Sequence, residues 1–444
     1  MISLADVVPF RGLRYNPAVA PDLSLVISPP YDIISGVDQQ RYHEKNALNA
    51  IHLDYGIELP GDDGKENRYS RAAATFRQWQ NDRALLPDSK PAFYLCREEF
   101  LLGDGSTATR EGFIALIRLA DFSEGIVLPH EETASGPKQD RLRLMQATEA
   151  NLSAIFCLYA DPGQQVIGVL NKAATDEPAA RVTDEAGTVH SLWIVDAPDA
   201  TAAVNRLLSD KTLLIADGHH RYETALAYRD KRRAAESPSE DMPCDYMMVY
   251  LSDLENTGQS ILPIHRFVSG LSEETTRDLL QSLEESFTVE ELTGSAAECQ
   301  QQMTNAMDTA GDTQNIFGMY FVAAGTYHIL TGRQSRPMIS TEASSKSSAY
   351  RSLDIAVLDQ TILSGILEIS TGGSNENASV RFVERTEKAL SELNTPGLDA
   401  AFFVNPTSME EIKSVAEAGE KMPQKSTYFY PKPVTGLVFR SFNI

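Results

Sequence analysis

The sequence predicts an α/β (α+β) protein with mixed sheets, and three observations indicate this fold class. Short apolar runs typical of buried strands alternate along the chain with segments whose apolar residues recur at helical spacing. Hydrophobic residues make up 42% and charged residues 23% of the chain, as in soluble globular proteins. At 444 residues the chain exceeds the ~250–300 residues that one core usually spans. We therefore expect two α/β domains, residues 1–264 and 265–444.

Helices and strands interleave in the first of these regions. A helix is expected over residues 69–81, where apolar side chains recur at helical spacing. Two strands, 92–100 and 110–118, are joined by a turn of hairpin composition. Pro137 is expected to open a helix that runs to about residue 150. Further along, we expect strands at 153–159, 190–195 and 213–216 and a helix near 199–208.

The same alternation continues in the second region. The predicted helices cover residues 273–287, 296–307, 352–368 and 409–419, with a further helix that ends at 393. The predicted strands are 315–323 and 326–330, which form a hairpin, then 379–383, 400–404 and a closing pair after 422. This arrangement is typical of an α/β domain with mixed pairing.

Charge and cysteine content narrow the classes of partner. The chain has 39 Lys+Arg against 62 Asp+Glu, a net charge of −23, which disfavours nucleic acid and anionic membranes. Four scattered cysteines without a CxxC pair indicate buried thiols in a reducing compartment. The first residues lack a basic start followed by an apolar run, so no signal peptide is expected, and no apolar run reaches membrane-spanning length. We expect a cytoplasmic protein that acts on a small-molecule substrate, and the oligomeric state stays open.

The passage 212–226 carries the strongest chemical signal. A buried-strand run is followed by Asp217, an expected helix N-cap, and by Gly218, which allows a tight turn and close approach of a ligand. His219, His220 and Arg221 then fall on the first turn of a helix. The dipole, the backbone donors and a forked cation together form an anion site. The alternative is that these histidines are ordinary capping or surface residues. Of two adjacent helical residues, one commonly packs inward, so we expect this of one histidine.

A second cluster spans residues 128–141. His130 and Glu131 lie in a loop before Pro137, and Lys138 and Arg141 follow on the expected helix. A hydroxyl acceptor needs a base, and a transferring phosphoryl group needs cations on its oxygens. Glu131 and Lys138 are the best candidates for these roles. The alternative is a solvated loop followed by salt bridges one helical turn apart.

Three further residues could reach a substrate or close over it. Arg11 lies beside Gly12 in a loop, Asp32 follows two prolines and a tyrosine, and Lys425 lies in an aromatic-rich segment. Surface exposure, an Asx turn and core packing are the respective alternatives. Walker A, GxGxxG and HExxH motifs are absent from the sequence.

Six separated motifs resemble one family along essentially the whole chain. They are Pro9–Gly12, Ser28–Asp32, Pro129–Glu131, Pro137–Leu142, Asp217–Tyr222 and Met422–Thr427. Together they resemble the uncharacterised prokaryotic family DUF1015.

The segment Asp217–Tyr222 is also similar to the signature of the ParB/sulfiredoxin superfamily. There, a glycine turn at a helix start holds nucleotide phosphates, and free serine kinases carry a Gly-His-His-Arg version with a glutamate base. The resemblance implies a ParB/sulfiredoxin-like nucleotide-binding core followed by a C-terminal α/β domain. The chain has His219 where sulfiredoxin needs cysteine, which excludes that thiol chemistry. It also lacks an evident basic recognition helix like that of ParB proteins.

The leading hypothesis is a phosphotransferase that uses ATP or ADP with Mg²⁺ and a hydroxylated acceptor such as free L-serine. In this hypothesis Gly218, His219, His220 and Arg221 hold the phosphates, and Asp217 positions the metal or the loop. Lys138 and Arg141 neutralise the transferring group, and Glu131, with His130 beside it, takes the acceptor's proton. The alternatives are a nucleotide-binding regulatory module without catalysis and a phosphoester hydrolase that uses His219 or His220.

Overall fold

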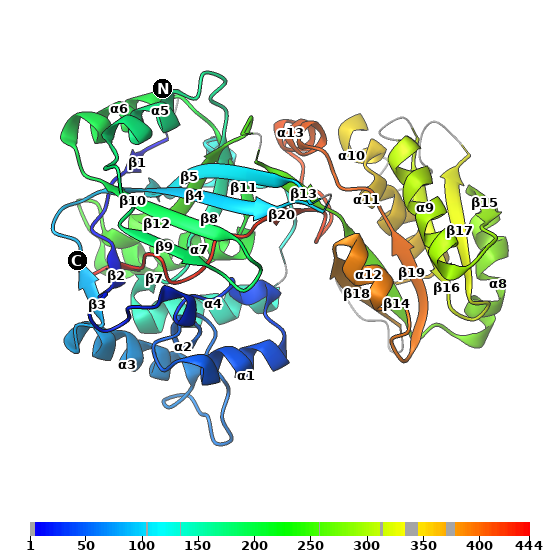
Figure 1. The fold of residues 1–444 in the computed structure, drawn as a ribbon, viewed down its shortest axis with the longest axis horizontal. Helices are drawn as coiled ribbons and strands as arrows, with labels where there is room; N and C mark the ends of the chain where they lie inside the picture. Colours follow the sequence, from blue (N-terminus) through cyan, green and yellow to red (C-terminus); the bar gives the residue numbers. More distant parts are fainter. Residues whose placement is uncertain are drawn as a thin grey trace. The chain divides into compact units, whose positions relative to one another are not determined.

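The fold is seen in a computed structural model that describes most of the chain as two compact units (Figure 1). The structure describes residues 5–103, 105–133, 135–256, 258–310, 314–333, 345–369 and 378–444. The first unit comprises Met1–Pro129, Ala134–Gln259 and Pro431–Ile444, and the second comprises His130–Thr133 and Ser260–Tyr430. Both combine helices with sheets, which confirms the α/β (α+β) class. The division into domains 1–264 and 265–444 stays a prediction.

The first unit contains most of the elements expected for the amino-terminal half. Its helices are α1 Gly36–Lys45, α2 Ile51–Asp54, α3 Arg68–Asn81, α4 Ser135–Thr148, α5 Gln165–Ala173, α6 Pro198–Leu208 and α7 His219–Glu236. Its strands are β1 Val7–Val8, β2 Leu13–Tyr15, β3 Leu85–Pro87, β4 Phe93–Leu101, β5 Thr107–Arg118, β6 Val127–Leu128, β7 Ala150–Asn151, β8 Ile155–Tyr159, β9 Ala180–Thr183, β10 Val189–Val195, β11 Leu213–Asp217, β12 Tyr246–Asp253 and β21 Arg440–Ser441. Among these helices and strands, the predicted 69–81, 92–100, 110–118 and 190–195 are confirmed.

The main sheet of the first unit is mixed, as expected. Its described strands follow the order β6-β11-β8-β12-β5-β4-β10-β9, with β1 paired to β5. β11 is parallel to β6 and β12 is parallel to β8, whereas the other neighbours are antiparallel. β8 is buried along its whole length, because it lies between two other strands.

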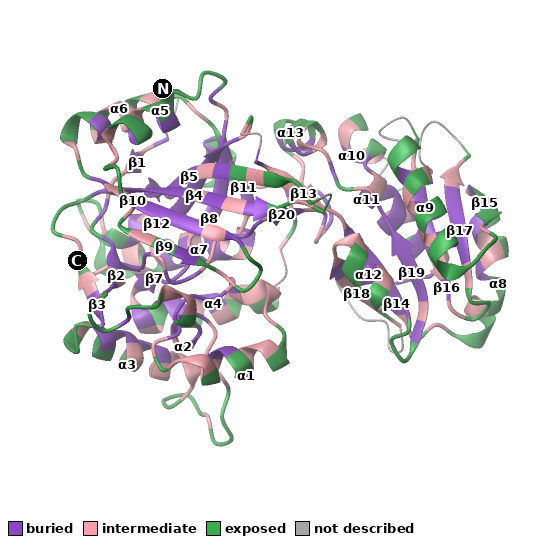
Figure 2. Cartoon of the chain, viewed as in Figure 1, coloured by how far each residue is buried: buried purple, intermediate pink, exposed green. Residues whose placement is uncertain are grey.

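One face of this sheet forms the principal core with three helices. Phe113 and Val249 from the strands pack with Val166 of α5, Val204 of α6 and Tyr222 of α7. Figure 2 shows the strands buried and the outer sides of the helices exposed. α5 and α6 are joined to this face by apolar residues at helical spacing, so the amphipathic pattern of the sequence fixes which side of each helix turns inward.

The opposite face meets a second cluster and the end of the chain. Tyr15, Phe76 and Trp79 pack there with Phe439, in a cluster that includes side chains of α2 and α3. The carboxyl-terminal residues pair with the rest of the first unit three times, through β21 with β7 and through the bridges Ser28–Thr435 and Leu13–Phe439. The end of the chain is therefore part of the first unit's core.

The second unit is built on an antiparallel sheet. Its helices are α8 Glu273–Glu284, α9 Ala296–Ala310, α10 Ser348–Ser352, α11 Asp354–Val357, a π-helix Leu358–Ile366, α12 Thr386–Ser391 and α13 Met409–Glu417. Its strands are β13 Ser260–Leu262, β14 Ile264–Ser269, β15 Phe287–Glu291, β16 Ile316–Phe321, β17 Thr326–Gly332, β18 Ser379–Glu384, β19 Leu398–Phe403 and β20 Tyr428–Tyr430. The larger sheet has the order β15-β17-β16-β19-β14-β18, and β13 pairs with β20.

Three expected helices differ in detail from the structure. α8 ends at Glu284, and Phe287 begins a strand because its side chain joins the sheet core. The helix predicted over 352–368 is divided, with α11 leading into the π-helix. α4 begins at Ser135, so Pro137 lies inside the first turn. N–H groups of a first turn have no intrahelical acceptor, so a proline there breaks no helical hydrogen bond.

No helix among the described residues combines the length and the apolar character needed to cross a membrane.

Candidate functional site

The turn between β11 and α7 is shaped by Gly218. Gly218 is the N-cap of α7 with φ 97° and ψ 27°, a left-handed conformation that favours glycine. A Cβ atom at this position would lie 2.9 Å from Nη2 of Arg221. The expectation that Asp217 caps the helix is wrong, because Asp217 is still in the strand and its carboxylate is used in ion pairs instead.

Asp217 lies at the centre of a buried ion-pair cluster. Its Oδ2 accepts a hydrogen bond from Nη2 of Arg221 at 2.9 Å, and its Oδ1 contacts the ammonium of Lys432. Lys432 also donates to Oδ2 of Asp32 at 2.9 Å. Burial disfavours the charged form of Lys432, but Asp217 and Asp32 outweigh it and raise the pKa of the ammonium. Lys432 therefore stays charged, and we call these four residues the Asp217 cluster.

Arg221 is held by the main chain as well as by Asp217. Its Nη1 donates to the carbonyl of Ala154 at 2.6 Å and to Oγ of Ser153 at 3.3 Å. Its side chain is only 7% exposed. Its Nε is buried and has no hydrogen-bond partner among the described residues, so one donor of the fork remains unused. The sequence-predicted phosphate-binding arginine is thus rigidly placed.

Arg141 lies in the same buried region as Arg221. Both line a cavity with about 340 Å³ of empty space, open solvent included, together with Asp54 and Ser153. Nη1 of Arg141 donates to Oδ1 of Asp54 at 3.2 Å, and its guanidinium lies 3.9 Å from the ring centre of Tyr31. Burial raises the pKa of Asp54, against the lowering effect of Arg141. The structure therefore brings together two of the cations that the sequence analysis selected.

Lys138 and the two histidines lie on neighbouring helices. Lys138 of α4 donates to Oε2 of Glu223 on α7 at 2.9 Å. His219 is buried, and His220 is half-buried. Since adjacent helical residues face different directions, this difference agrees with the expectation that one histidine packs inward.

The two weaker candidates of the first unit have separate roles. Arg11 is exposed, and its Nε donates to the carbonyl of Asp88 at 3.0 Å. Asp32 lies in a single helical turn, Tyr31–Ile33, and joins the Asp217 cluster through Lys432. Asp32 was a candidate from the sequence, but its partner Lys432 was not predicted. Lys432 stands between two prolines, and the aromatic residues just before it favoured a core-packing interpretation of the segment.

His130, Glu131 and Lys425 come together in the second unit. Oε1 of Glu131 accepts from the backbone N–H of Lys425 at 2.9 Å, and Glu131 forms a parallel bridge with Met422. His130 is fully buried, with Nε2 2.9 Å from Oγ1 of Thr427. Two separately predicted motifs, Pro129–Glu131 and Met422–Thr427, therefore contact each other. Their assigned roles in catalysis stay predictions.

A buried pair beside this contact was not predicted. Arg266 of β14 is fully buried, and its Nε lies 3.5 Å from Oδ1 of Asp359 on the π-helix. Burial raises the pKa of Asp359 to about 6, against the lowering effect of Arg266. π-Helical turns are rare and occur often at functional sites. The sequence does carry a signal for Asp359, because it lies four residues after Ile355 and three before Ile362, on the apolar face of the predicted helix.

A metal centre built by the protein alone is not seen in the part of the chain that the structure describes. No group of three or more His, Cys, Asp or Glu side chains is placed to hold an ion there.

Comparison with solved structures gives distant likenesses. One is a conserved hypothetical protein from Pyrococcus furiosus, with 14% identity, a TM-score of 0.34, and coverage of 71% of this chain and 90% of that chain. A free serine kinase variant in complex with AMP has 13% identity, a TM-score of 0.36, and coverage of 71% and 87%. C-terminally truncated SbnI from Staphylococcus aureus has 13% identity, a TM-score of 0.33, and coverage of 73% and 86%. No function is drawn from likenesses this distant.

Comparison of sequences is more decisive. No curated protein matches the chain. Residues 7–356 match the family described as "Protein of unknown function (DUF1015)", in agreement with the motifs noted in the sequence. This match covers well over half of the chain, so the protein belongs to the DUF1015 family.

Proposed function

We propose that this protein is a small-molecule phosphotransferase that moves a phosphoryl group from ATP or ADP to the hydroxyl of a metabolite, with free L-serine as the expected acceptor. The observation that carries this proposal is the start of α7. There a glycine with positive φ, two histidines and a fixed guanidinium surround the N-terminus of an 18-residue helix.

Three physical effects make this corner suited to phosphate. The first N–H groups of a helix have no intrahelical acceptors, and the helix dipole favours negative charge beside them. Gly218 has no side chain to keep a ligand away from this backbone. Arg221 is oriented by Asp217 and Ala154, so little side-chain entropy is lost when an anion binds. In this proposal His220, which is half-buried, contacts the ligand, and His219 packs beneath it.

Asp32 and Asp217 are the carboxylates that would hold Mg²⁺ in this site. Mg²⁺ usually binds one or two carboxylates together with substrate phosphates, so a preformed protein cage is not required. Both carboxylates contact one cation, the ammonium of Lys432, and this shared contact supports the proposal. When bound, Mg²⁺ would neutralise charge on the phosphates.

The base for the acceptor hydroxyl is assigned from the sequence to Glu131, with Lys138 and Arg141 as cations for the transferring group. Of these, Arg141 and Lys138 belong to the first unit, and Glu131 belongs to the second. Glu131→Gln keeps the shape of the side chain but removes its ability to accept a proton. This substitution is expected to abolish turnover and to leave nucleotide affinity unchanged, which can be measured by calorimetry.

A second candidate function is a nucleotide-binding module that regulates without catalysis. The observation in its favour is that Arg221 and Lys432 are each paired with carboxylates, so the Asp217 cluster is already neutral. This alternative expects nucleotide to stabilise the protein to the same extent in wild type and in Glu131→Gln, with no product from either.

The test is incubation of the full chain with L-serine, Mg²⁺ and either ATP or ADP, followed by ³¹P NMR and mass spectrometry. Phosphoserine is the expected product. His220→Gln should weaken nucleotide binding about tenfold, whereas His43→Gln, a half-buried histidine of α1, should not. Phosphate release without an acceptor would indicate a hydrolase. No nucleotide-dependent product with any hydroxylated metabolite would refute the phosphotransferase.

A further inference from the structure

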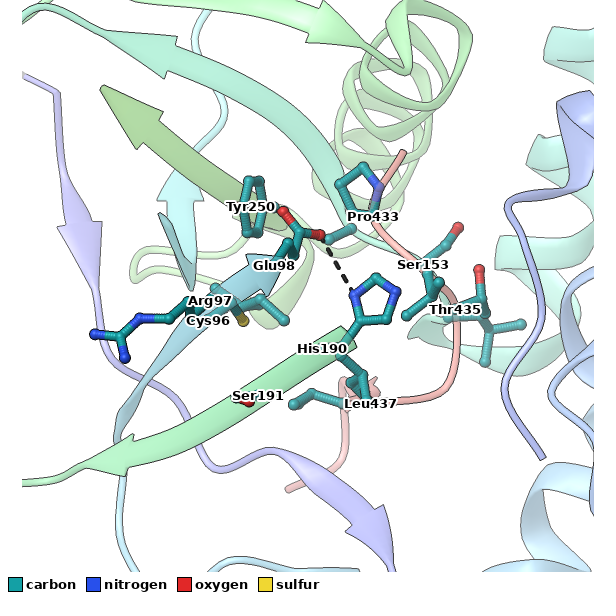
Figure 3. A pocket seen from close by; sticks show the side chains of 15 residues that line it. Cys96, Arg97, Glu98, Ser153, His190, Ser191, Tyr250, Pro433, Thr435 and Leu437 are labelled. Carbon is teal, nitrogen blue, oxygen red and sulfur yellow. Dashed lines mark hydrogen bonds and ion pairs between the residues drawn. The ribbon is translucent and has the colours of Figure 1, made fainter. Parts of the chain in front are cut away.

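A second pocket in the first unit is lined by charged side chains that lie outside the motifs recognised in the sequence (Figure 3). Its empty space is about 430 Å³, a figure that includes open solvent at its mouth. Glu98 of β4, His190 of β10, Tyr250 of β12 and Thr435 of the carboxyl-terminal segment line it. Figure 3 shows the carboxylate of Glu98 and the imidazole of His190 directed toward each other.

Strand register explains why these groups meet. Glu98 is directly opposite His190 on one neighbouring strand and directly opposite Arg110 on the other. Side chains of directly opposed residues share one face of a sheet. Oε2 of Glu98 accepts from Nε of Arg110 at 2.6 Å and from the hydroxyl of Tyr250 at 3.0 Å. These two hydrogen bonds from Arg110 and Tyr250 therefore hold the carboxylate of Glu98 in place.

Asp184 holds the His190 ring through Nε2, the nitrogen that does not face Glu98. Its Nε2 lies 2.9 Å from Oδ2 of Asp184, and its Nδ1 lies 3.6 Å from Oε1 of Glu98, which is longer than a hydrogen bond. Nδ1 is buried and has no hydrogen-bond partner among the described residues, and the same holds for Oγ1 of Thr435. Both atoms belong to side chains at most 2% exposed. Nδ1 of His190, which forms a long ion pair with Glu98, and Oγ1 of Thr435 thus line the pocket without a hydrogen bond.

The charges of this pair are well defined. Burial disfavours the imidazolium of His190, but Asp184 and Glu98 raise its pKa to about 9. Burial also acts against the ionised form of Glu98, yet Arg110 and His190 lower its pKa. Cys96 and Tyr250 also line this pocket, and burial raises the pKa of both far above neutrality, so neither adds charge. Near pH 7 the charged carboxylate of Glu98 and the charged imidazole of His190 therefore lie side by side in the pocket, and Arg97 also lines it.

We infer that this pocket binds a small zwitterionic amino acid, whose ammonium group pairs with Glu98 and whose carboxylate accepts hydrogen bonds from His190 and Thr435. A ligand that lacks its ammonium group would not pair with Glu98, and one that lacks its carboxylate would not pair with His190. Either loss should lower affinity. The inference gives the proposed function an acceptor site, and it rests on that function for its catalytic meaning.

The pocket borders the proposed phosphate site. Ser153 and Ala154 line it, and these are the two residues to which Nη1 of Arg221 donates. Only Ser153 and Ala154 would therefore separate a bound amino acid from the guanidinium of Arg221. Transfer to a side-chain hydroxyl requires the acceptor and the phosphate to be neighbours, and this shared boundary supports such an arrangement.

Calorimetry of the full chain without nucleotide tests the inference. L-Serine and L-alanine should bind, whereas ethanolamine and glycerate, which each lack one charge, should bind at least tenfold more weakly. Glu98→Gln should lose the preference for an ammonium group. Thr435→Val should reduce affinity several-fold, and it tests the site even if Glu98→Gln does not fold. His43→Gln is the matched control and should bind like wild type.

Absence of amino-acid binding, or unchanged affinity in both Glu98→Gln and Thr435→Val, would overturn the inference. Equal binding of ethanolamine, glycerate and L-serine would do the same. Nucleotide binding measured in parallel separates this outcome from failure of the proposed function: loss of amino-acid binding with intact, His220-dependent nucleotide binding refutes only the pocket. Amino-acid binding without any nucleotide binding refutes only the phosphotransferase.

Discussion

The first unit holds buried charge in two places, the Asp217 cluster and the pocket lined by Glu98 and His190, which we call the Glu98 pocket. In the Asp217 cluster, a strand end, a helix start and two loop segments converge, and its cations are a lysine and an arginine. In the Glu98 pocket, directly opposed residues of adjacent strands meet, and one of its cations is a histidine. The pKa values of Lys432 and Arg221 are raised, so both cations of the first arrangement stay protonated at physiological pH. The histidine of the second arrangement loses its charge in mildly alkaline solution, because its pKa is about 9.

The largest expected effect comes from Lys432→Met in the Asp217 cluster. Lys432 is buried, and its replacement removes the cation that the partly buried Asp32 and Asp217 share; removal of one partner of a buried pair costs up to about 3–5 kcal/mol. Urea unfolding should show this loss of stability. Lys413→Met is the control, since Lys413 is 58% exposed and should change stability little. Equal behaviour of the two variants would show that the cluster does not stabilise the fold.

The Glu98 pocket should make stability depend on pH. The folded pKa of His190 is about 9 against an ordinary value near 6.5, so its stabilisation is complete below about pH 6.5 and is lost as pH rises through 9. Each pKa unit corresponds to about 1.4 kcal/mol, which gives a loss on the order of 3 kcal/mol. Urea unfolding at pH 6 and at pH 9.5 measures it. His190→Gln should remove most of this difference, and a slope that persists in the variant contradicts the assignment.

Gly218→Ala should cost about 1–2 kcal/mol, because an L-residue is disfavoured in the left-handed conformation. The added Cβ would also press against Arg221, so nucleotide affinity should fall together with stability. Gly168→Ala is the matched control. It lies inside α5 with open space around it, and the change should raise helix stability by up to about 1 kcal/mol. If Gly218→Ala is as stable as wild type, the turn does not need glycine.

The smallest effect on stability is expected for Thr435→Val. The hydroxyl of Thr435 has no hydrogen-bond partner among the described residues, so its loss should change the free energy of unfolding by less than about 1 kcal/mol. The comparison is sharpened by measuring amino-acid affinity in the same variant. A large loss of stability with unchanged affinity would make the hydroxyl structural.

The sequence allowed prediction of features that are local along the chain. Apolar periodicity located α3 and β4, and the contiguous residues of the β11–α7 turn indicated a phosphate-binding corner. The motifs that contain Glu131 and Lys425 were each noted, but their contact joins positions 294 apart. Periodicity carries no information at that separation.

The Glu98 pocket could not be predicted because it depends on strand register. Glu98 lies on a strand whose alternate positions are otherwise apolar, which marks it as a charge on a buried face only once the register is known. Lys432 and Asp32 are likewise 400 positions apart. The N-cap was misassigned for a local reason: Asp217 is a good capping residue by type, but Arg221 and Lys432 compete for its carboxylate.

The return of residues 431–444 to the first unit has a consequence for synthesis in the cell. A ribosome synthesises Asp32 and Asp217 before the second unit and the lysine that neutralises them after it. Amino-terminal domains usually fold first during translation. Here the first unit completes its ion-pair cluster only once residues 431–444 have been made, so we expect a nascent chain arrested before residue 431 to remain open to proteases until elongation resumes.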